Sequence, residues 1–262
     1  MRVHVVSDVH GNVEAFKRAG DGADALVVLG DLIDFVDYHD HGNGILGRIF
    51  GAEKVARFAE LRRSRRGPEF GNYVRSLWDS LTDPAQTVAD AVREQYAELF
   101  AVMTAPTYLT PGNVDAPHLW PEFAREGIQV LDGEATEIGG LRFGFVGGVR
   151  LPEGAVLRRH SAWVPHLLES EDYDRLVAAL PEVDVLCSHQ PPAVPELTYD
   201  VVARRPELGA PSLLERIRTD RPRWSLFGHV HQPLAPRMRI GRTECVNAGH
   251  FQRTEKPYVL RW

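Results

Sequence analysis

The 262-residue sequence is poor in cysteine and has no apolar run long enough to span a membrane. Its two cysteines, Cys187 and Cys245, cannot build a disulfide framework, and both sit in apolar strand-like runs where a thiol acts as a small hydrophobic side chain. A reducing compartment fits this usage, so we expect a cytoplasmic protein without a membrane partner. Internal repeats and low-complexity tracts are also absent, which leaves an ordinary globular architecture.

Positive charge is in deficit, since 30 Lys and Arg residues stand against 36 Asp and Glu residues, a formal net charge of −6. Such a balance gives no global attraction to phosphate backbones, so nucleic acid is not favoured as a partner, although a local basic patch stays open. The content of 44% apolar and 25% charged residues is typical of globular domains. We expect one domain over residues 1–262, with two smaller domains as the alternative.

Short β-branched runs recur along the chain, and each ends at a cluster of Gly, Asp, Asn or His. The clearest predicted strands in this pattern span residues 3–6, 25–29, 107–110, 183–187 and 225–227. Between some of them lie helix-like segments, at residues 13–19 and 116–126. The second half is richer in strands, predicted at residues 135–138, 141–146, 243–246 and 258–260. This order predicts an α/β protein with a mixed or parallel sheet.

The stretch from about residue 38 to residue 105 instead shows helical periodicity. Asp83, Pro84 and Gln86 have the positions of an N-cap, a first-turn proline and a capping-box partner. Apolar residues at helical spacing follow: Val88, Ala91, Val92, Leu99, Phe100 and Met103. We therefore expect a helical insertion in the α/β scaffold. Its dense basic run at residues 62–66 is interpreted as a solvated face rather than a nucleic-acid site.

Five short segments place metal-ligating side chains just after predicted strands. They are Asp8-Val9-His10, Gly30-Asp31-Leu32-Ile33-Asp34, Gly112-Asn113-Val114-Asp115, Ser188-His189 and Gly228-His229-Val230-His231. An Asp-x-His triplet alone is weak evidence, because a second one occurs at Asp37-Tyr38-His39. The Gly-Asp-x-x-Asp, Gly-Asn-x-Asp and Gly-His-x-His patterns are rarer, and their joint occurrence after strands favours a site over coincidence.

The spacing within these segments is consistent with ligands that share one cleft. Residues two apart on an extended segment project to the same side, so Asp8 with His10, and His229 with His231, can face one cleft. We expect the glycines before three of the ligands to permit sharp bends at strand ends. Carboxylate, amide and imidazole groups together suit Mn, Fe, Co, Ni or Zn. Seven such groups are too many for one ion, whereas two ions that share a carboxylate use them all.

The ordered set of motifs, over residues 8–231, resembles the calcineurin-like metallophosphoesterase superfamily. The resemblance implies a four-layer αββα sandwich of two mixed β-sheets, here with the helical insertion. It also implies two groups of metal ligands around a bridging Asp31: Asp8, His10 and His231 in one, and Asn113, His189 and His229 in the other. Asp34 and Asp115 would orient these ligands from behind.

The same resemblance implies a metal-dependent phosphoester hydrolase, in which a hydroxide between two metal ions attacks phosphorus in line and Asp31 and Asn113 are catalytic. Members of the family commonly have a histidine after the Asn, which protonates the leaving group or stabilises the transition state, but this chain has Val114. A general acid contributes about a hundred- to ten-thousandfold, so its absence disfavours strongly basic leaving groups. We therefore favour a phosphodiesterase for a small phosphoester over a phosphomonoesterase or a nuclease.

Four further residues are candidates for contact with the substrate. His250, His39 and His41 are substitute proton donors, and Arg150 is a candidate phosphate contact, with a structural or solvated role as the alternative for each. The alternative of another class is a non-catalytic interaction scaffold with the same fold, against which the full set of competent ligands argues. The sequence leaves open the physiological substrate, the native metals and the oligomeric state.

Overall fold

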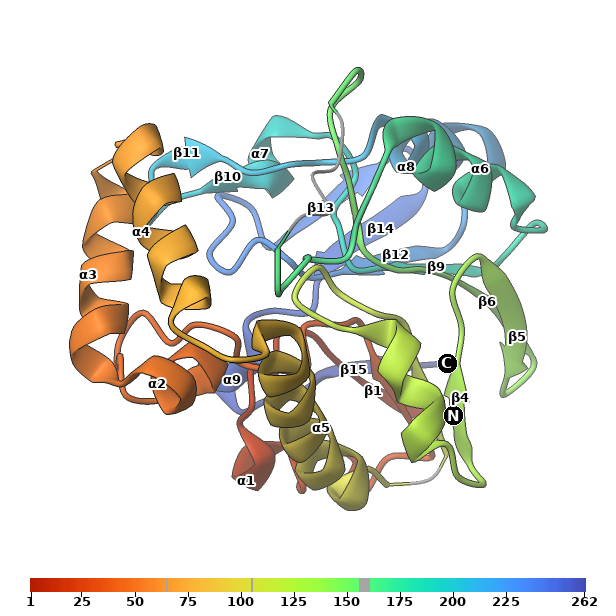
Figure 1. The fold of residues 1–262 in the computed structure, drawn as a ribbon. Coiled ribbons are helices and arrows are strands. Elements are labelled where there is room, and N and C mark those ends of the chain that lie inside the picture. Colours follow the sequence, from red (N-terminus) through yellow and green to blue (C-terminus); the bar gives the residue numbers. More distant parts are fainter. Residues whose placement is uncertain (65, 105, 156–160) are drawn as a thin grey trace.

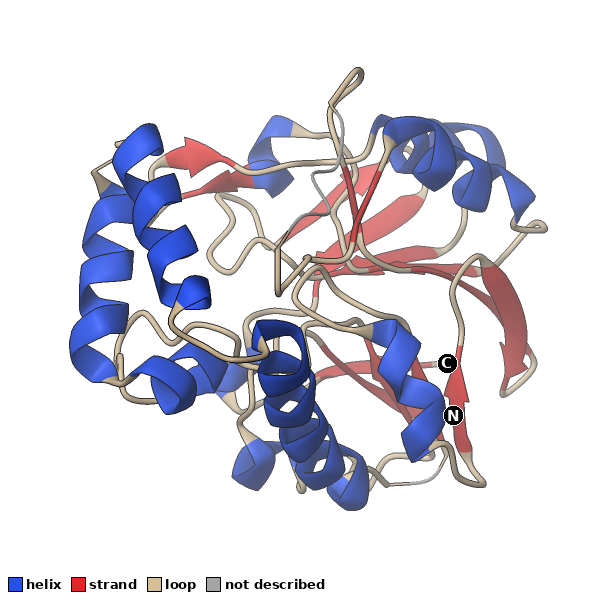
Figure 2. Cartoon of the chain, in the orientation of Figure 1, coloured by secondary structure: helices blue, strands red, loops and turns tan. Residues whose placement is uncertain are grey.

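The computed structural model describes residues 1–64, 66–104, 106–155 and 161–262. Two mixed β-sheets lie face to face, and helices cover the outer face of each (Figure 1, Figure 2). The predicted four-layer αββα sandwich is thereby confirmed. Arg65 of the basic run and Ala105 at the end of the expected insertion lie outside the described residues.

The first sheet has the strand order β15-β1-β2-β3-β4. Its strands are β1 (Arg2–Val6), β2 (Ala25–Val28), β3 (Thr107–Leu109), β4 (Ile128–Val130) and β15 (Tyr258–Arg261). The first four run parallel, and β15 pairs with β1 in the antiparallel sense. The carboxyl ends of β1, β2 and β3 therefore meet at one edge of the sheet, the position where open α/β sheets bind their ligands.

The second sheet has the strand order β13-β14-β12-β9-β6-β5. Its strands are β5 (Glu134–Ile138), β6 (Leu141–Val146), β9 (Val185–Ser188), β12 (Trp224–Phe227), β13 (Arg237–Ile240) and β14 (Thr243–Asn247). The inner four run parallel, whereas β5 and β13 are antiparallel edge strands. Two short ladders lie outside both sheets: β7 (Val149–Arg150) with β8 (Leu167–Leu168), and β10 (Tyr199–Asp200) with β11 (Arg205–Pro206).

The core follows from the two-residue period of the strands. In β1, Val3 and Val5 pack between the sheets, whereas Val6 packs against the outer helices. In β2, Val27 faces the second sheet and Val28 faces the helices. Strands covered on both faces need apolar residues at most positions, which explains the unbroken apolar run of β2 and the mainly apolar β1, where His4 is the buried exception.

Helices surround the sandwich on both sides. They are α1 (Val13–Phe16), α2 (Gly44–Phe50), α3 (Ala52–Arg63), α4 (Gly67–Asp79), α5 (Pro84–Val102), α6 (Ser170–Ala179), α7 (Pro195–Thr198), α8 (Pro211–Asp220), α9 (Phe251–Thr254) and the 3₁₀ helix η1 (Pro117–Phe123). The segment between β2 and β3 contributes α2 to α5, and α3 and α4 stand beside the sandwich (Figure 1). Among the described residues, no helix has the length and apolar character needed to cross a membrane.

Helix boundaries differ from the predicted ones where local chemistry intervenes. Asp83 caps α5 as predicted, since its carboxylate accepts the Gln86 N–H at 3.0 Å. The predicted capping box is wrong, because the Gln86 side chain donates to Asp90 at 2.7 Å instead. The segment expected as a helix over residues 116–126 is the 3₁₀ helix η1, which contains Pro121, and proline lacks the N–H that an α-helix needs there.

Candidate metal centre

All seven predicted ligand residues follow strands, and both sheets contribute. Asp8 and His10 follow β1, Asp31 follows β2, Asn113 follows β3, His189 follows β9, and His229 and His231 follow β12. The parallel strands of each sheet direct their carboxyl ends toward the same edge. The site therefore lies where loops of the two sheets meet.

The turns that carry the ligands adopt left-handed backbone conformations. The φ angle is 57° at Asp8, 41° at His10, 53° at Asp31 and 66° at His229. The prediction that the Asp-x-His and His-x-His segments are extended is therefore wrong. Each such conformation costs about 1–3 kcal/mol in a residue other than glycine and persists only where the surroundings enforce it. Here Asp8 donates its N–H to the Gly30 carbonyl and His10 donates its N–H to the Asp31 carbonyl, both at 3.0 Å, so the two turns hold each other.

The glycines before the ligands do not all act as bends. Gly30 has a φ of 86°, as expected for a sharp turn. Gly112 and Gly228 lack a positive φ, but a Cβ would lie 2.2 Å from Asp31 Oδ1 at the first and 1.8 Å from Ser7 Oγ at the second. These two glycines are required because neighbouring chain segments approach their Cα atoms closely.

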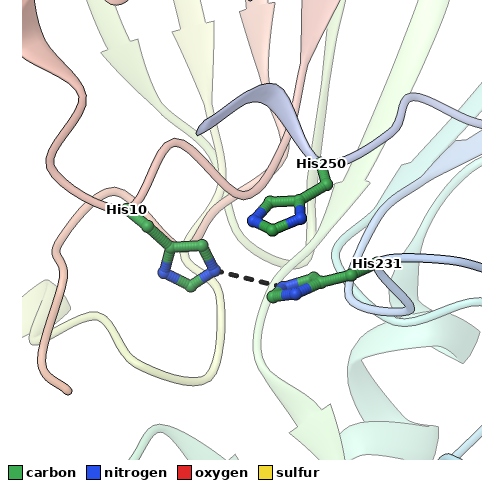
Figure 3. A group of neighbouring side chains, drawn as sticks. All are labelled: His10, His231 and His250. Atoms are coloured by element: carbon green, nitrogen blue, oxygen red, sulfur yellow. Dashed lines mark hydrogen bonds between the residues drawn. The ribbon is translucent and has the colours of Figure 1, made fainter. Parts of the chain in front are cut away.

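Backbone carbonyls determine which ring nitrogen carries the proton in two histidines. His189 Nδ1 lies 2.7 Å from the Leu29 carbonyl, and His10 Nδ1 lies 3.3 Å from the Ile33 carbonyl. A carbonyl only accepts, so each Nδ1 carries the proton and each Nε2 keeps a lone pair. The Nε2 lone pair of His189 then faces Asn113 Oδ1 at 3.1 Å, which is also an acceptor. The Nε2 lone pair of His10 faces His231 Nε2 at 3.2 Å (Figure 3).

Two buried carboxylates complete this group of acceptors. Asp31 Oδ2 lies 3.5 Å from His189 Nε2 and 3.9 Å from His10 Nε2, between the two sets of ligands. Asp8 Oδ1 lies 3.3 Å from His231 Nε2, yet it is buried and has no hydrogen-bond donor among the described residues. Among these atoms only His231 Nε2 can donate, so most of the acceptors face one another without a donor, which is costly unless a cation lies among them. The residues present therefore fit a divalent metal with oxygen and nitrogen ligands.

Asp115 ties two ligand loops together from behind. Its carboxylate accepts the N–H of Leu32 at 3.0 Å and the N–H of Gly112 at 2.8 Å. These residues flank Asp31 and Asn113, so the carboxylate sets the spacing of the two loops. Burial, and then the negative charge of Asp31, raises the pKa of Asp115 to about 6.

The backbone of Asp34 is held by the side chain of Gln95 in α5. Its N–H donates to Gln95 Oε1 at 2.9 Å, and Gln95 Nε2 donates back to its carbonyl at 3.3 Å. Burial, and then the charge of Asp37, raises the pKa of the Asp34 carboxyl to about 7. This carboxyl is therefore partly protonated in the folded protein at neutral pH.

The raised pKa of Asp34 predicts a pH dependence of stability. The folded protein binds a proton that the unfolded chain has lost above its pKa of 3.8, so this carboxyl favours folding less and less as pH rises from about 4 to 7. Replacing Asp34 by Asn should remove that loss, which is on the order of 2–4 kcal/mol. Urea unfolding of chelator-treated protein at pH 5 and pH 8 measures it. Equal pH dependence in Asp34→Asn and wild type would contradict the assignment, and Asp90→Asn, on the exposed face of α5, is the control.

The four predicted substrate contacts lie in different surroundings. Arg150 donates from Nε and Nη2 to the two carboxylate oxygens of Asp174, each at 2.8 Å, so its guanidinium is committed to an ion pair. His39 contacts Arg253 on the surface, and His41 Nε2 is buried without a hydrogen-bond partner in the described part of the chain. His250, in contrast, joins a group of possible metal ligands, with His10 and His231.

Two arginines of the basic run have partners within the helical segment. Arg62 contacts the Tyr38 hydroxyl, and Arg66 pairs with Glu69 at 3.3 Å. Both side chains are thus engaged within the helical segment, which is in keeping with a solvated structural face.

Several residues that shape the site are absent from the sequence prediction. The carbonyls of Leu29 and Ile33 carry no sequence signal, because any residue supplies a carbonyl. Gln95 and Gln252 have no recognisable motif either, because only the fold brings them to the ligand turns. There Gln95 accepts the Asp34 N–H, and Gln252 donates to the His10 carbonyl at 3.1 Å.

Comparison with known proteins gives one family match. A model of the calcineurin-like phosphoesterase family matches residues 1–233. A search of curated proteins finds no significant match. The solved structure of TT1561 from Thermus thermophilus is 15% identical with a TM-score of 0.55, and the match covers 99% of this chain and 98% of that one. Another solved structure has a TM-score of 0.58 at the same identity and coverage.

These two structures support the fold alone at such low identity. An archaeal phosphodiesterase is more distant, with 12% identity, a TM-score of 0.39, and coverage of 99% of this chain and 91% of that one, and it carries no argument here. The family match, in contrast, spans most of the chain and includes every ligand motif. The chain therefore belongs to the calcineurin-like phosphoesterase family and is a phosphoester hydrolase.

Proposed function

We propose that this hydrolase is a phosphodiesterase that works with two divalent cations. The observation that carries the proposal is the position of Asp31, whose carboxylate lies between two sets of acceptors that face one another. One set is Asp8, His10 and His231, and the other is Asn113, His189 and His229. Their oxygen and nitrogen atoms suit Mn, Fe, Co, Ni or Zn.

The protein's own groups prepare this site before any substrate arrives. The Leu29 and Ile33 carbonyls keep Nε2 of His189 and His10 free of protons, and Asp115 fixes the spacing of the loops that carry Asp31 and Asn113. Two divalent cations bound there would lower the pKa of water toward neutrality and neutralise charge on a phosphoryl group. Such preorganisation limits the rearrangement needed during the reaction.

The preference for diesters rests on position 114. The side chain that follows Asn113 is an aliphatic valine, packed against the apolar cluster of the helices, and cannot donate a proton. Val114 contributes only its N–H, which donates to Asp31 Oδ1 at 2.9 Å. Without a proton donor at that position, esters with weakly basic leaving groups should react best.

A metal titration with matched substrates tests the proposal. Protein stripped with a chelator should be inactive on an activated aryl phosphodiester and on the matching monoester. Added Mn²⁺, Co²⁺ or Zn²⁺ should restore hydrolysis, with the higher kcat/KM on the diester. Absence of hydrolysis with every metal would refute the site, and a higher kcat/KM on the monoester would refute the diester preference.

Replacing Val114 by His should shift the substrate preference. We expect kcat/KM on an alkyl phosphomonoester, whose leaving group is strongly basic, to rise about tenfold or more, because a general acid helps most where the leaving group is poor, and we expect a smaller rise on the activated aryl diester. Val114→Leu, which adds no proton donor, is the control for altered packing. An equal rise on both substrates would show that the missing acid does not set the preference.

A further inference from the structure

A third histidine, His250, is fixed on the turn that carries Asp8 and His10. It stands just before the short helix α9, and the next two residues bind the ligand turn through their backbones. Phe251 donates its N–H to the Ser7 carbonyl and Gln252 donates its N–H to the Asp8 carbonyl, both at 3.0 Å. The position of the His250 ring is thereby tied to the position of the ligands after β1.

The His250 ring is directed into the ligand group. It stacks on the His231 ring with centroids 3.9 Å apart and planes at 22°, and its centroid lies 5.8 Å from that of His10 (Figure 3). One nitrogen from each of the three rings lies within 4.8 Å of the other two. The His250 side chain is buried, with 9% of the residue exposed.

Hydrogen bonds to Gln252 determine which His250 nitrogen carries the proton. The Gln252 amide nitrogen donates to the His10 carbonyl at 3.1 Å, which orients the amide and leaves Oε1 toward His250. Oε1 lies 3.1 Å from His250 Nε2 and can only accept, so Nε2 is the protonated nitrogen. His250 Nδ1 is then a bare lone pair, and it is buried without a hydrogen-bond partner among the residues that the structure describes.

This tautomer argues against the proton-donor role considered from the sequence. The Nε2 proton is committed to Gln252, and Nδ1 has none to give. A buried imidazole with one N–H bound to a fixed acceptor and the other nitrogen free is instead the usual arrangement of a metal-ligating histidine.

We propose that His250 is an additional metal ligand, which binds through Nδ1 the cation assigned to Asp8, His10 and His231, and that Gln252 positions it. The inference rests on the proposed metal site and adds a ligand from the C-terminal segment. It makes Gln252 a positioning residue, because its amide links the His10 backbone to the His250 ring.

Nitrogen NMR of the ring tests the proposal without an activity assay. Chelator-treated wild-type protein labelled with ¹⁵N-histidine is titrated with Zn²⁺, and the His250 signals are identified by their loss in His250→Gln. We expect Nε2 to be protonated throughout and the Nδ1 signal of His250 to shift together with the ring signals of His10 and His231. The exposed His118 is the internal control and should not shift.

The outcomes separate the inference from the function on which it rests. Shifts at His10 and His231 with an unmoved His250 overturn the extra ligand and leave the proposed function standing. No shift at any of the three overturns both. Since this measurement uses the wild-type chain, it does not depend on whether a variant folds.

Mn²⁺ affinity gives a second, independent readout. Equilibrium dialysis should show binding of one Mn²⁺ weakened at least about tenfold in His250→Gln, and about tenfold in Gln252→Leu, as for loss of a residue that orients a ligand. Gln252→Glu keeps the acceptor for His250 Nε2–H but loses the N–H that donates to the His10 carbonyl, so it should restore only part of the affinity. His118→Ala is the matched control, and wild-type affinity in His250→Gln would overturn the proposal.

Discussion

Replacing Asp31 by Asn should reduce metal-dependent phosphoester hydrolysis at least about a thousandfold. Asp31 Oδ2 is placed near both His10 and His189, so its charge would be shared by both cations. An amide in its place binds divalent cations more weakly, and a loss of about 4 kcal/mol in transition-state stabilisation corresponds to that factor.

Folding should survive the Asp31→Asn change. Asparagine adopts the left-handed conformation required by the φ of 53° more readily than most residues, and its Oδ1 can still accept the Val114 N–H. We expect the free energy of unfolding of the metal-free protein to stay within about 1 kcal/mol of wild type. Measurement of kcat/KM at saturating Mn²⁺, beside urea unfolding, checks both points. Retained activity would refute the bridging role, and Asp90→Asn controls for loss of a surface carboxylate.

Adding a single methyl group at Gly30 should destabilise the protein by about 3 kcal/mol or more. The φ of 86° is unfavourable for alanine, and a Cβ would lie 2.1 Å from the Gly112 nitrogen. At Gly112 the backbone conformation is not the obstacle, but a Cβ would lie 2.3 Å from the Asp31 nitrogen and 2.2 Å from its Oδ1. Gly112→Ala should therefore displace the shared carboxylate and lower kcat/KM about a hundredfold.

Two other glycines separate conformational strain from steric overlap. Gly241 has a φ of 59° with open space around it in the described structure, so Gly241→Ala should cost only about 1 kcal/mol. Gly71 lies in α4 with no described neighbour near its Cα, and Gly71→Ala should stabilise by up to about 1 kcal/mol. Thermal and urea unfolding of the four variants gives the comparison. If Gly112→Ala proved as harmless as Gly71→Ala, the close approach of the two loops would be refuted.

The strands of both sheets were largely predictable because burial on both faces leaves a local trace. β1, β2, β6, β9 and β12 are mainly apolar, and Gly, Asp or His follows each of them within two residues, a pattern that is visible without any tertiary information. The segment containing η1 has the apolar periodicity of an α-helix but forms a 3₁₀ helix, because its prolines lack the N–H donors that a regular α-helix needs.

The positions of the predicted ligand residues just after strands could be predicted, but their conformations could not. Asp8 and His10 were expected on an extended segment, whereas hydrogen bonds from their N–H groups to the turn after β2 hold both in the left-handed region. Such bonds join residues far apart in the sequence and leave no local pattern. The same holds for His250, whose tautomer depends on Gln252 and on the distant His10 carbonyl.

The division of the ligands between the two sheets bears on when the site can form. The predicted ligands Asp8, His10, Asp31 and Asn113 follow β1 to β3, which are synthesised early, whereas His189, His229 and His231 follow β9 and β12, which are synthesised late, and β15 completes the first sheet last of all. When only the first half of the chain has been synthesised, only four of the seven predicted ligands are present to bind a cation. Cation uptake should therefore complete folding rather than initiate it, and once in place the cations would clamp one sheet to the other.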